Sequence, residues 1–383
     1  MKLGIVTHSL VKSDGQGRVN YEVACEAIRR GHHVTLLASE IAPELAKHHQ
    51  INWVPISVKG FPTELIRNMM FAFASANWLK KHHHELDCIK ANGAITWAKS
   101  DVNAVHFVHH SWLKFSDLQA TSSANKNIFK PRLFLYNSYQ WLYTKLNTRW
   151  EKEAFQKAKA VVAVSDKVAE DLRQIGVPQN VIRVISNGVD VEEFSPGKGA
   201  SRQTWNLPND VTLAMFAGDI RLPRKNLDTV LHALVEIPNL HLAVVGVTDG
   251  SPYPELAASL GISDRVHFLG FRRDVPSIMK VVDLFVFPSR YEPFGLVVTE
   301  AMATGLPVIT AACTGAAPLV TPEAGIVLAN PDDTKALSEA MHKLSVNPEL
   351  RTKMGQTARA IALQHTWKNV AKQYVDLFEE MHR

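Results

Sequence analysis

The sequence predicts an α/β protein of two doubly wound, Rossmann-like domains that face a central cleft. Its 383 residues are too many for one ordinary hydrophobic core and about right for two domains. Short β-branched runs alternate with helix-length amphipathic segments, which is the pattern of βαβ units and parallel sheets. The alternation starts again after a turn cluster near the middle of the chain, so the pattern predicts two sheets.

The first half opens on an apolar run and continues through seven predicted strands. Helix-length segments separate them, the first over Val19–Arg30. In chain order the predicted strands are Leu3–Thr7, Val34–Ala38, Asn52–Ile56, Cys88–Ala91, Val102–Val108, Ala160–Val164 and Arg183–Ile185.

The second half repeats the arrangement after a linker, which we place at the turn cluster Ser186–Gly188 and the segment Ser195–Gly199. Helices are predicted over Asn226–Val235 and Leu296–Ala303. The predicted strands are Val211–Ala217, Leu240–Val245, Val266–Leu269, Leu284–Phe287 and Pro307–Ile309.

The composition is that of an ordinary globular protein, with 46% hydrophobic and 21% charged residues. It excludes a disordered or fibrous chain. The longest near-apolar stretch, Met69–Leu79, is shorter than the roughly 18 residues of a membrane span, and the first residues are too short an apolar run for a secretory signal. Cys25, Cys88 and Cys313 lie far apart and indicate neither a disulfide framework nor a zinc site, so we expect a cytoplasmic protein.

The net charge of +5 is unevenly distributed along the chain. Residues 1–190 contain 24 Lys and Arg against 16 Asp and Glu, a net +8, whereas residues 191–383 contain 18 against 21, a net −3. Two interpretations are open: solvated faces with a chance excess, or a first half that meets an anionic surface or substrate. No nucleic-acid recognition motif accompanies the basic half, so nucleic acid is not a predicted partner.

A glycine-containing loop, Ser13–Arg18, connects the first predicted strand to the first helix. Gly15 and Gly17 allow backbone N–H groups and a helix N-terminus to approach a phosphate. A dinucleotide fingerprint needs a third glycine where this chain has Asn20, so nicotinamide binding is disfavoured. The loop is either a plain strand-to-helix turn or part of a pyrophosphate cradle.

A histidine cluster, His106-Phe107-Val108-His109-His110, lies at the carboxyl end of a predicted strand, where doubly wound domains place functional groups. A single histidine there is as often packed as functional, but three within five residues favour a functional role. No cysteine or fourth ligand is near in the sequence, so a zinc site is disfavoured.

The most informative stretch runs from Phe287 to Glu300. A predicted buried strand ends at Phe287, a loop presents Glu292, and Gly295 opens a helix that carries Glu300. Such carboxylates can accept hydrogen bonds from hydroxyl groups, and N–H groups at the helix start can bind an anion. Sugar hydroxyls and a diphosphate on one ligand satisfy both features, whereas the alternative is two unrelated glutamates.

A basic pair, Arg224-Lys225, lies between another predicted strand and its helix, in the segment Gly218–Asn226. At the strand's carboxyl end these cations would neutralise the charge that grows on a leaving phosphate. The alternative is that they are solvated surface residues.

Together and in order, these features resemble family 4 of the retaining glycosyltransferases, which have the GT-B fold. The resemblance covers nearly the whole chain and is densest over residues 181–310. The motifs that carry it are Val184–Asp190 with Phe194 and Pro196, Arg224-Lys225, Val266-x-Phe268-x-Gly270, the E-x7-E pair Glu292 and Glu300, and Gly31–Val34.

The resemblance implies transfer of a sugar from a nucleoside diphosphate sugar, with a UDP-sugar preferred over a GDP-sugar and the anomeric configuration retained. It implies an acceptor-binding domain of residues 1–187, to which a C-terminal helix of about 367–383 returns, and a donor-binding domain of residues 188–366. The expected acceptor is a glycan or a lipid-linked sugar of cell-envelope polysaccharide, lipopolysaccharide or glycolipid synthesis.

The family pattern also implies roles for the candidate residues. Glu292 would contact the donor hexose, Arg224 and Lys225 the diphosphate, and His109 would lie near the donor sugar and the acceptor. The other implied donor-binding residues are Gly15, Gly17, Gly218, Arg221, Phe271, Arg272, Phe294, Gly295, Leu296 and Glu300, the last of these at the ribose.

One departure from the family concerns the phosphate-binding cations. Where the family often has Gly-Arg, this chain has Gly218-Asp219, so either Arg221 substitutes or Arg224 with Lys225 suffices. The chain contains no D-x-D sequence, so no metal and no other cofactor are expected. The basic pair then carries the stabilisation of the leaving group, and attack from the leaving-group face is the preferred mechanism.

Two alternative functions stay open. Another GT-B enzyme, such as a nucleotide-sugar epimerase or a glycogen-type synthase, would share the fold. A catalytically silent sugar-nucleotide-binding subunit would share the donor site. The glutamate pair, the basic pair and His109 favour an enzyme.

The sequence also suggests a membrane partner. Residues 124–159 mix basic and aromatic side chains, and the amphipathic stretch Leu65–His84 ends in a basic pair, which suits contact with lipid headgroups. The alternative is that the aromatic residues pack the core and the charges are solvated. We expect the triplet His82–His84 to be a solvated helix end. Peripheral association with an anionic surface on the cytoplasmic membrane face is therefore a hypothesis.

Overall fold

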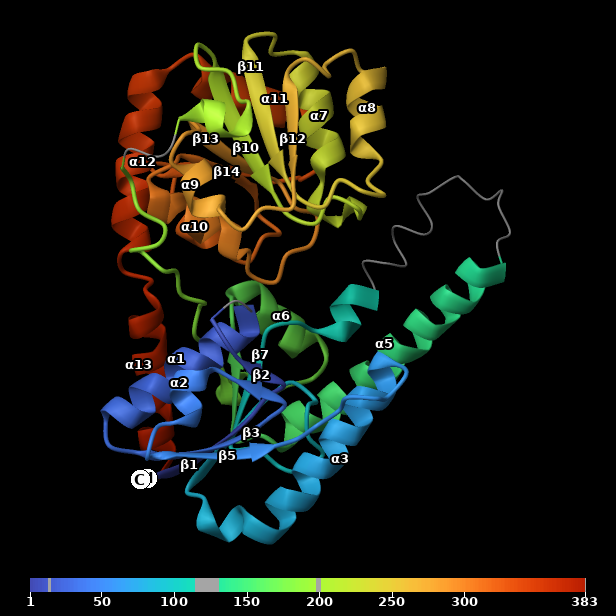
Figure 1. The fold of residues 1–383 in the computed structure, drawn as a ribbon, viewed down its shortest axis with the longest axis vertical. Coiled ribbons are helices and arrows are strands. Elements are labelled where there is room, and N and C mark those ends of the chain that lie inside the picture. The colour runs from blue at the N-terminus through green and yellow to red at the C-terminus, as the bar shows by residue number, and fades with distance from the viewer. Residues whose placement is uncertain (13–14, 114–130, 198–200, 383) are drawn as a thin grey trace. The chain divides into compact units, whose positions relative to one another are not determined.

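The computed structural model describes residues 1–12, 15–113, 131–197 and 201–382, with the backbone alone over 131–138. The chain folds as two compact units (Figure 1). The first comprises Met1–Asn187 and Trp367–Arg383, and the second comprises Gly188–Thr366. Each unit has its own parallel sheet flanked by helices, which confirms the predicted pair of doubly wound α/β domains.

The first unit is built on a sheet in which seven parallel strands are described, in the order β5-β3-β1-β6-β7-β8-β9. The chain proceeds outward from β1 and then returns to its other side at β6, so the topological switch point lies between β1 and β6. The strands are β1 (Lys2–Val6), β3 (His33–Ala38), β5 (Ile51–Pro55), β6 (Cys88–Asn92), β7 (Val102–Val105), β8 (Ala160–Ala163) and β9 (Ile182–Val184).

Helices cover both faces of this sheet. Phe71 and Leu79 of α3 (Glu64–His82) pack with Ile89 and Ala91 of β6 in a buried apolar cluster. Side chains alternate along a strand, so Lys90 points to the opposite face, where α1 and α13 lie. The described helices of the unit are α1 (Gly15–Arg29), α2 (Pro43–Ala46), α3, α5 (Pro131–Lys157), α6 (Asp166–Gln174) and α13 (Trp367–His382).

Helix α13 joins the first unit although it follows the whole second unit in sequence. It packs along α1, with Tyr374 and Phe378 each 1% exposed. Arg30, at the end of α1, donates to Glu26 at 2.8 Å and reaches Asp376 at 2.8 Å and Glu379 at 3.1 Å across the contact. Apolar burial and a partly buried ion-pair network together hold the end of the chain on this unit.

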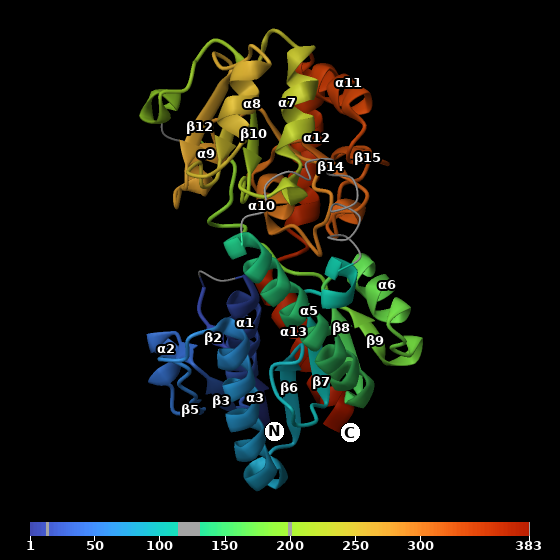
Figure 2. The same cartoon turned by 90° about the vertical axis from the view of Figure 1, so that its right-hand side faces the viewer.

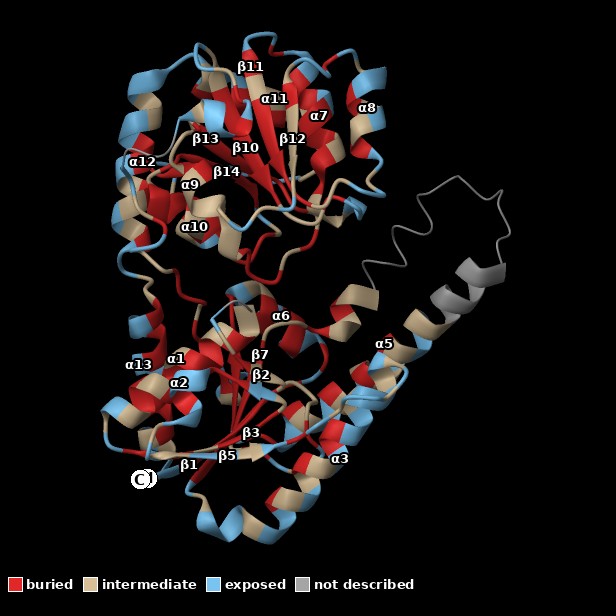
Figure 3. Ribbon diagram, viewed as in Figure 1, coloured by how far each residue is buried: buried red, intermediate tan, exposed pale blue. Residues whose placement is uncertain are grey.

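The second unit repeats the architecture with six described parallel strands in the order β12-β11-β10-β13-β14-β15. Here the switch point lies between β10 and β13. The central strands are buried on both faces (Figure 3), as expected when helices cover a parallel sheet. The strands are β10 (Thr212–Ala217), β11 (Leu240–Val245), β12 (Val266–Gly270), β13 (Leu284–Phe287), β14 (Val308–Ala311) and β15 (Gly325–Leu328).

The helices of the second unit alternate with these strands. Arg359 ties its last described helix to the start of the unit, because its guanidinium donates to the carbonyls of Val191, Phe194 and Ala303 at 2.6–2.9 Å. The helices are α7 (Leu227–Val235), α8 (Tyr253–Ser259), α9 (Val275–Met279), α10 (Leu296–Thr304), α11 (Thr334–Ser345) and α12 (Pro348–Ala362).

Several predicted element ends were wrong. The first helix starts at Gly15 rather than Val19, so both loop glycines lie in its first turn. The strand predicted over 102–108 ends at Val105, which leaves the histidine cluster outside it. Strand β15 was missed because it begins with a glycine that resembles a turn residue. A Cβ on Gly325 would lie 2.1 Å from the carbonyl oxygen of Val308, so the glycine serves close strand packing there.

Two other predictions concern surface segments. His82 is the last residue of α3, and His83 and His84 are exposed, as interpreted for a solvated helix end. Part of the basic and aromatic stretch 124–159 lies outside the described residues, as do the loop residues 13–14 and the side chains of 131–138. Among the helices that the structure describes, none combines the length and apolarity needed to cross a bilayer.

Candidate functional site

The switch point of the second unit gathers most of the predicted site residues. Strands β10 and β13 are neighbours and run parallel, so the segments that follow them leave the sheet at the same edge. Residues 218–226 follow β10, and residues 288–295 follow β13.

The structure brings Arg224, Lys225 and Glu292 together at this edge. The Lys225 amine donates to Oε2 of Glu292, and Nη1 of Arg224 lies 3.4 Å from the same oxygen. The Arg224 guanidinium also donates to the carbonyl of Tyr291 at 3.3 Å, and the Lys225 amine lies 5.0 Å from the centre of the Phe287 ring. Two cations share one carboxylate, which leaves one net positive charge at the switch point.

Burial dominates the ionisation of Lys225. Loss of water around the amine lowers its pKa, although the charge of Glu292 opposes the shift. Because the amine is poorly solvated, its attraction to a phosphate is screened less than it would be in water. The cluster is therefore suited to binding charge that develops on a ligand.

Hydrogen bonds between the two loops hold the cluster in place. The backbone N–H of Arg290 and the hydroxyl of Ser289 both donate to the carbonyl of Arg224, at 2.9 Å and 3.0 Å. Asn226 is fully buried with a φ of 67°, and its side-chain amide donates to the carbonyl of Pro288 at 2.9 Å. The short helix η4 (Pro223–Lys225) is thereby fixed against the loop that carries Glu292.

The start of α10 is shaped by two close approaches. Gly295 caps the helix with a φ of 97°, and a Cβ there would lie 3.0 Å from Thr314 Cγ2 and 3.2 Å from Glu292 Cγ. Gly315 donates from its N–H to the carbonyl of Glu292 at 2.9 Å, and a Cβ on it would lie 1.9 Å from the carbonyl oxygen of Pro293. Phe294, Gly295 and Leu296 therefore present their backbone beside Glu292.

Glu300 is the fifth residue of α10, eight residues after Glu292. Burial, followed by the charge of Glu193, raises the pKa of Glu300 to about 7. No described cation pairs with its carboxylate. At pH 7 such a carboxyl group is a mixture of an ionised form, which only accepts hydrogen bonds, and a protonated form, which also donates one.

The remaining donor-binding candidates of this unit have other partners. Arg221 donates to both carboxylate oxygens of Asp219, at 2.9 Å and 2.8 Å, so its guanidinium is engaged by the residue that departs from the family pattern. Arg272 makes a similar pair with Asp274, at 2.8 Å and 2.6 Å. Phe271, just past β12, is 70% exposed. Gly218 packs against the stem of Lys225, where a Cβ would meet the side chain at 3.5 Å.

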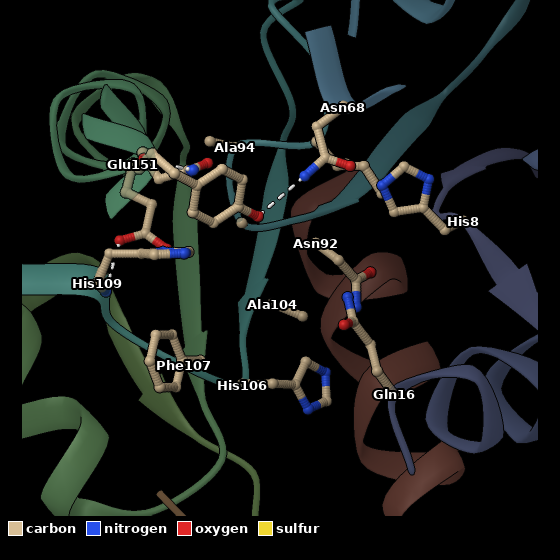
Figure 4. Close-up of a pocket in the computed structure, with 14 residues that line it drawn as sticks. His8, Gln16, Asn68, Asn92, Ala94, Ala104, His106, Phe107, His109 and Glu151 are labelled. Atoms are coloured by element: carbon tan, nitrogen blue, oxygen red, sulfur yellow. Dashed lines mark hydrogen bonds and ion pairs between the residues drawn. The ribbon is translucent and has the colours of Figure 1, made fainter. Parts of the chain in front are cut away.

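In the first unit, a cavity of about 170 Å³ lies at the carboxyl ends of β1, β6 and β7, and His109 lines it (Figure 4). Glu151 accepts a hydrogen bond from the His109 backbone N–H at 2.9 Å, and its other oxygen lies 2.7 Å from the ring Nδ1. An ionised carboxylate accepts only, so Nδ1 carries the proton and Nε2 is left for the cavity. Glu151 therefore sets the tautomer and the orientation of His109.

Other polar groups complete this cavity. Gln16 lies between the predicted Gly15 and Gly17 in the first turn of α1 and lines the cavity, whereas neither glycine lines it. The amide of Asn68 donates to the Tyr143 hydroxyl at 3.0 Å, as Figure 4 shows. His106 also lines the cavity, where burial and then the charge of Lys90 lower its pKa to about 3.

Sequence reasoning missed several of these residues. Glu151 lies 42 residues from His109, and Asn92 and Lys90 belong to an unremarkable strand, so nothing local in the sequence indicates a role for any of the three. Thr314 and Gly315 follow β14 at the carboxyl edge, a position that could have singled them out. In the part of the chain that the structure describes, no three His, Cys, Asp or Glu side chains are grouped to hold a metal ion.

Comparisons with known protein families match both units. The sequence model described as "Glycosyltransferase Family 4" matches residues 13–193, and that described as "Glycosyl transferases group 1" matches residues 198–361. A D-inositol 3-phosphate glycosyltransferase from Saccharomonospora viridis is 30% identical over 60% of this chain, and the match spans 57% of that protein. One from Corynebacterium efficiens is 25% identical over 89% of this chain and 82% of its own length.

Solved structures share the fold. A sucrose-phosphate synthase from Thermosynechococcus elongatus is 20% identical, covers 99% of this chain and 98% of its own, and has a TM-score of 0.78. WaaG, a glycosyltransferase involved in lipopolysaccharide biosynthesis, is 23% identical, with a TM-score of 0.73 and coverage of 98% and 99%. Anabaena Alr3699/HepE in complex with UDP and glucose is 21% identical, with a TM-score of 0.72 and coverage of 99% and 100%. Family models that cover both units and this shared architecture establish that the chain belongs to the family 4 glycosyltransferases, with the GT-B fold.

Proposed function

We propose that this chain transfers a sugar from a nucleoside diphosphate sugar, preferentially a UDP-sugar, to a hydroxyl group of an acceptor, with retention of the anomeric configuration. The observation that carries the proposal is the cluster of Arg224, Lys225 and Glu292 at the switch point of the second unit. It combines cations for a diphosphate with a carboxylate for sugar hydroxyls beside the start of α10, where Leu296 and Val297 are partly exposed.

In the proposed reaction, the bond between the anomeric carbon and the diphosphate oxygen breaks, and negative charge develops on the diphosphate. Lys225 and Arg224 stabilise this charge more in the transition state than in the ground state, and that difference lowers the barrier. Glu292 accepts hydrogen bonds from the donor sugar as its cations turn to the phosphates. Neither Glu292 nor Glu300 serves as a nucleophile, so the acceptor hydroxyl bonds to the anomeric carbon from the leaving-group face and passes its proton to the departing diphosphate oxygen. The reaction needs no metal in this proposal.

The first unit supplies the acceptor side of the proposed reaction. His109 is held by Glu151 with its Nε2 directed to the cavity, which suits a group that positions a hydroxyl near the donor sugar. The names of similar proteins suggest where to look for acceptors. Relatives are named for D-inositol 3-phosphate, and WaaG and WaaB for lipopolysaccharide synthesis, so cyclitols and envelope saccharides head the list to be screened. HepE complexes with UDP and with UDP-glucose favour the uridine donor.

The first test is a panel of nucleoside diphosphate sugars scored by released nucleoside diphosphate, with and without an acceptor mixture. We expect turnover with at least one UDP-sugar. Lys225→Ala should lower that turnover roughly 100- to 1,000-fold, as removal of a donor to developing charge does in other enzymes. The matched control is Lys335→Ala, an exposed lysine on α11 of the same unit, which should leave turnover unchanged.

Several outcomes would contradict the proposal. A Lys225→Ala variant with wild-type turnover would reject the role of the basic pair. Interconversion of the donor without release of nucleoside diphosphate would indicate an epimerase, and growth of a uniform glucan would indicate a glycogen-type synthase. Binding of UDP-sugars with no turnover of any would indicate a silent subunit. The anomeric configuration of the product, read by NMR, tests retention.

We also propose that the first unit associates peripherally with an anionic membrane on the cytoplasmic side. Helices α3 and α5 lie side by side in both views (Figures 1 and 2), and the Tyr139 hydroxyl of α5 accepts from the Leu65 N–H of α3 at 3.1 Å. Their exposed apolar residues, nearby lysines, and Trp97 of the loop after β6, whose ring centre lies 6.4 Å from that of Phe73, form what we term the α3–α5 surface. It comprises Ile66, Met70, Phe73, Lys80, Lys81, Trp97, Trp141, Lys145 and Lys152. Large exposed apolar side chains beside lysines suit a headgroup interface.

A further inference from the structure

The cavity of the first unit contains buried hydrogen-bonding atoms that have no partner among the described residues. They are Nδ2 of Asn92 and Nε2 of His106, and both residues line the cavity. Asn92 is only 4% exposed, so bulk water does not form hydrogen bonds with its amide. Buried polar groups in native proteins are almost always paired, and an unpaired one that faces a cavity indicates a missing ligand atom.

Lys90 determines which end of the Asn92 amide faces the cavity. Lys90 is 1% exposed, and its amine donates to Oδ1 of Asn92 at 2.8 Å and to Oδ1 of Asn20 at 2.5 Å. Because this amine donates to the Asn92 oxygen, that oxygen faces Lys90 and the amide N–H2 faces away from it. Asn20 is fixed in turn, because its own amide donates to Thr7 Oγ1 at 3.1 Å. The orientation of Asn92 is therefore set before any ligand arrives.

The charge of the cavity limits what can fill it. No lysine or arginine is among the described residues that line it, and its one described carboxylate, Glu151, is occupied by His109. The buried amine of Lys90 is engaged by the side-chain oxygens of Asn20 and Asn92. A phosphate group accepts hydrogen bonds and brings up to two negative charges, which this lining does not neutralise.

A hydroxyl group fits the same lining. It can accept from the Asn92 N–H, and it can donate to or accept from His106 Nε2, whichever tautomer the neutral ring adopts. Asn68, Asn147 and Gln16 add further amide groups around the cavity. We propose that this cavity binds an uncharged, polyhydroxylated part of the acceptor, such as a sugar or cyclitol ring without a phosphate, through Asn92 and His106. This inference rests on the proposed function and specifies its acceptor.

The test compares ligands that differ only in a phosphate group. Saturation-transfer NMR on the full chain, with saturating UDP, measures binding of methyl glycosides of the common hexoses and of myo-inositol against their monophosphates. We expect at least one uncharged ring to bind at least tenfold more tightly than its own monophosphate. Tighter binding of the monophosphates, or no binding by any uncharged ring, would overturn the proposal.

The variant His106→Phe separates a ligand-binding role from a structural one. Phenylalanine keeps the ring but removes the unpaired nitrogen, so the unfolding temperature should stay the same or rise. Binding of the uncharged ring should weaken at least tenfold, whereas the Kd for UDP should not change. His84→Phe, at an exposed histidine of the same unit, is the matched control and should alter neither. Unchanged ring binding in His106→Phe would also reject the proposal.

Lys90→Met tests the positioning role of the lysine. Without the donating amine, Asn92 can rotate its amide, so KM for the uncharged acceptor should rise at least fivefold while kcat and donor hydrolysis change little. Lys159→Met, which removes an exposed lysine paired with Asp101, is the control. Equal effects of the two variants on KM would refute the positioning role. Ring binding is measured without a sugar donor. A failed donor panel would therefore reject the proposed function, whereas the NMR binding experiment alone decides whether the cavity binds an uncharged ring.

Discussion

Glu292 and Glu300 are the same residue type on one loop and helix, but their surroundings separate their properties. Glu292 meets two cations, whereas no described cation pairs with Glu300, and burial raises the pKa of Glu300 to about 7. Similarly, His106 and His109 lie three residues apart, yet only His109 has a carboxylate partner. At the scale of single residues, function therefore depends on partners that lie far away in the sequence.

We expect Glu300 to make nucleotide binding pH-dependent. If the carboxylate accepts hydroxyl hydrogen bonds of the nucleoside, UDP binds best when Glu300 is ionised. Its raised pKa then predicts a Kd for UDP that falls by up to about tenfold between pH 6 and pH 8. Glu300→Gln should lose this component, and calorimetry of both proteins isolates it from the titration of UDP itself. Identical pH profiles would exclude a role for this carboxylate.

The raised pKa of Glu300 also predicts how the stability of the protein depends on pH. A carboxyl group whose pKa is raised in the folded state contributes its stability below the pKa of the unfolded chain and loses it as the pH rises through 7. The unligated Glu300→Gln variant should therefore be more stable than the wild type at pH 8. The gain should diminish toward pH 5, which thermal unfolding at the two pH values can measure.

At the scale of elements, each switch point places chemistry at the carboxyl edge of its sheet. The parallel arrangement of the strands predicts that the site lies at this edge, and the loops then determine which side chains meet there. The loop after β13 is shaped by the left-handed Gly295 and by the approach of Thr314 and Gly315. The loop after β10 is held by Asn226, which also adopts a left-handed conformation.

Gly295→Ala should disturb the start of α10. Alanine is strained at a φ of 97°, and its Cβ would press on Thr314 at 3.0 Å and on Glu292 at 3.2 Å. We expect a loss of about 2–3 kcal/mol in unfolding free energy and a weaker Kd for UDP. Gly250→Ala is the control: its φ is 74° with nothing within 4 Å, so it should cost only about 1 kcal/mol and leave UDP binding unchanged. Denaturant unfolding and calorimetry compare the two, and equal losses would show that close packing at Gly295 adds nothing.

Much of the fold and part of the site follow from the sequence. The β-branched runs mark the buried strands, and parallel strands place the Arg224-Lys225 and Glu292 segments at one edge. What local reasoning could not supply depends on tertiary contacts. Glu151 reaches His109 from 42 residues away, and Lys90 reaches Asn20 from 70 residues away. Strand β15 was not predicted, and it begins with Gly325, a residue type common in turns that here allows close strand packing.

At the scale of the whole molecule, the first unit depends on contacts made by both ends of the sequence. Arg30 connects α1 to α13 through Glu26, Asp376 and Glu379. Its neighbour Arg29 also pairs with Glu26, but its side chain is 64% exposed and it makes no described contact with α13. The two arginines therefore form a natural matched pair.

Arg30→Ala should destabilise the protein by about 2 kcal/mol, because it removes charge-assisted hydrogen bonds at a half-buried site. Arg29→Ala should cost under about 0.5 kcal/mol. Hydrogen bonds from Lys372 and then Arg30 lower the pKa of Asp376, and those from His32 and then Arg30 lower the pKa of Glu379. This stability is present at neutral pH and lost as acidification protonates both carboxyls, so the difference between the variants should shrink in acid. Denaturant unfolding at neutral and acidic pH measures the difference in unfolding free energy between the two variants. Equal losses of unfolding free energy at neutral pH would contradict the role of Arg30.

The α3–α5 surface makes a prediction for the intact protein. The chain should sediment with vesicles that contain phosphatidylglycerol at low salt, and much less with pure phosphatidylcholine, because lysines and exposed aromatics act together. The double variant Phe73→Ser and Trp141→Ser should lose most of this binding, since both side chains are about half exposed. Val346→Ser, 65% exposed in the second unit, is the control and should bind as the wild type does. No sedimentation with anionic vesicles would reject the association.

The return of α13 to the first unit also has a consequence for how the protein is made. The second unit is continuous in sequence, so a ribosome delivers all of it before the last helix emerges. Until then Lys90 and the apolar surface of α1 lack the cover that Tyr374 and Phe378 provide. The unit synthesised first is therefore the last to be completed, because α13 follows the whole second unit in the sequence.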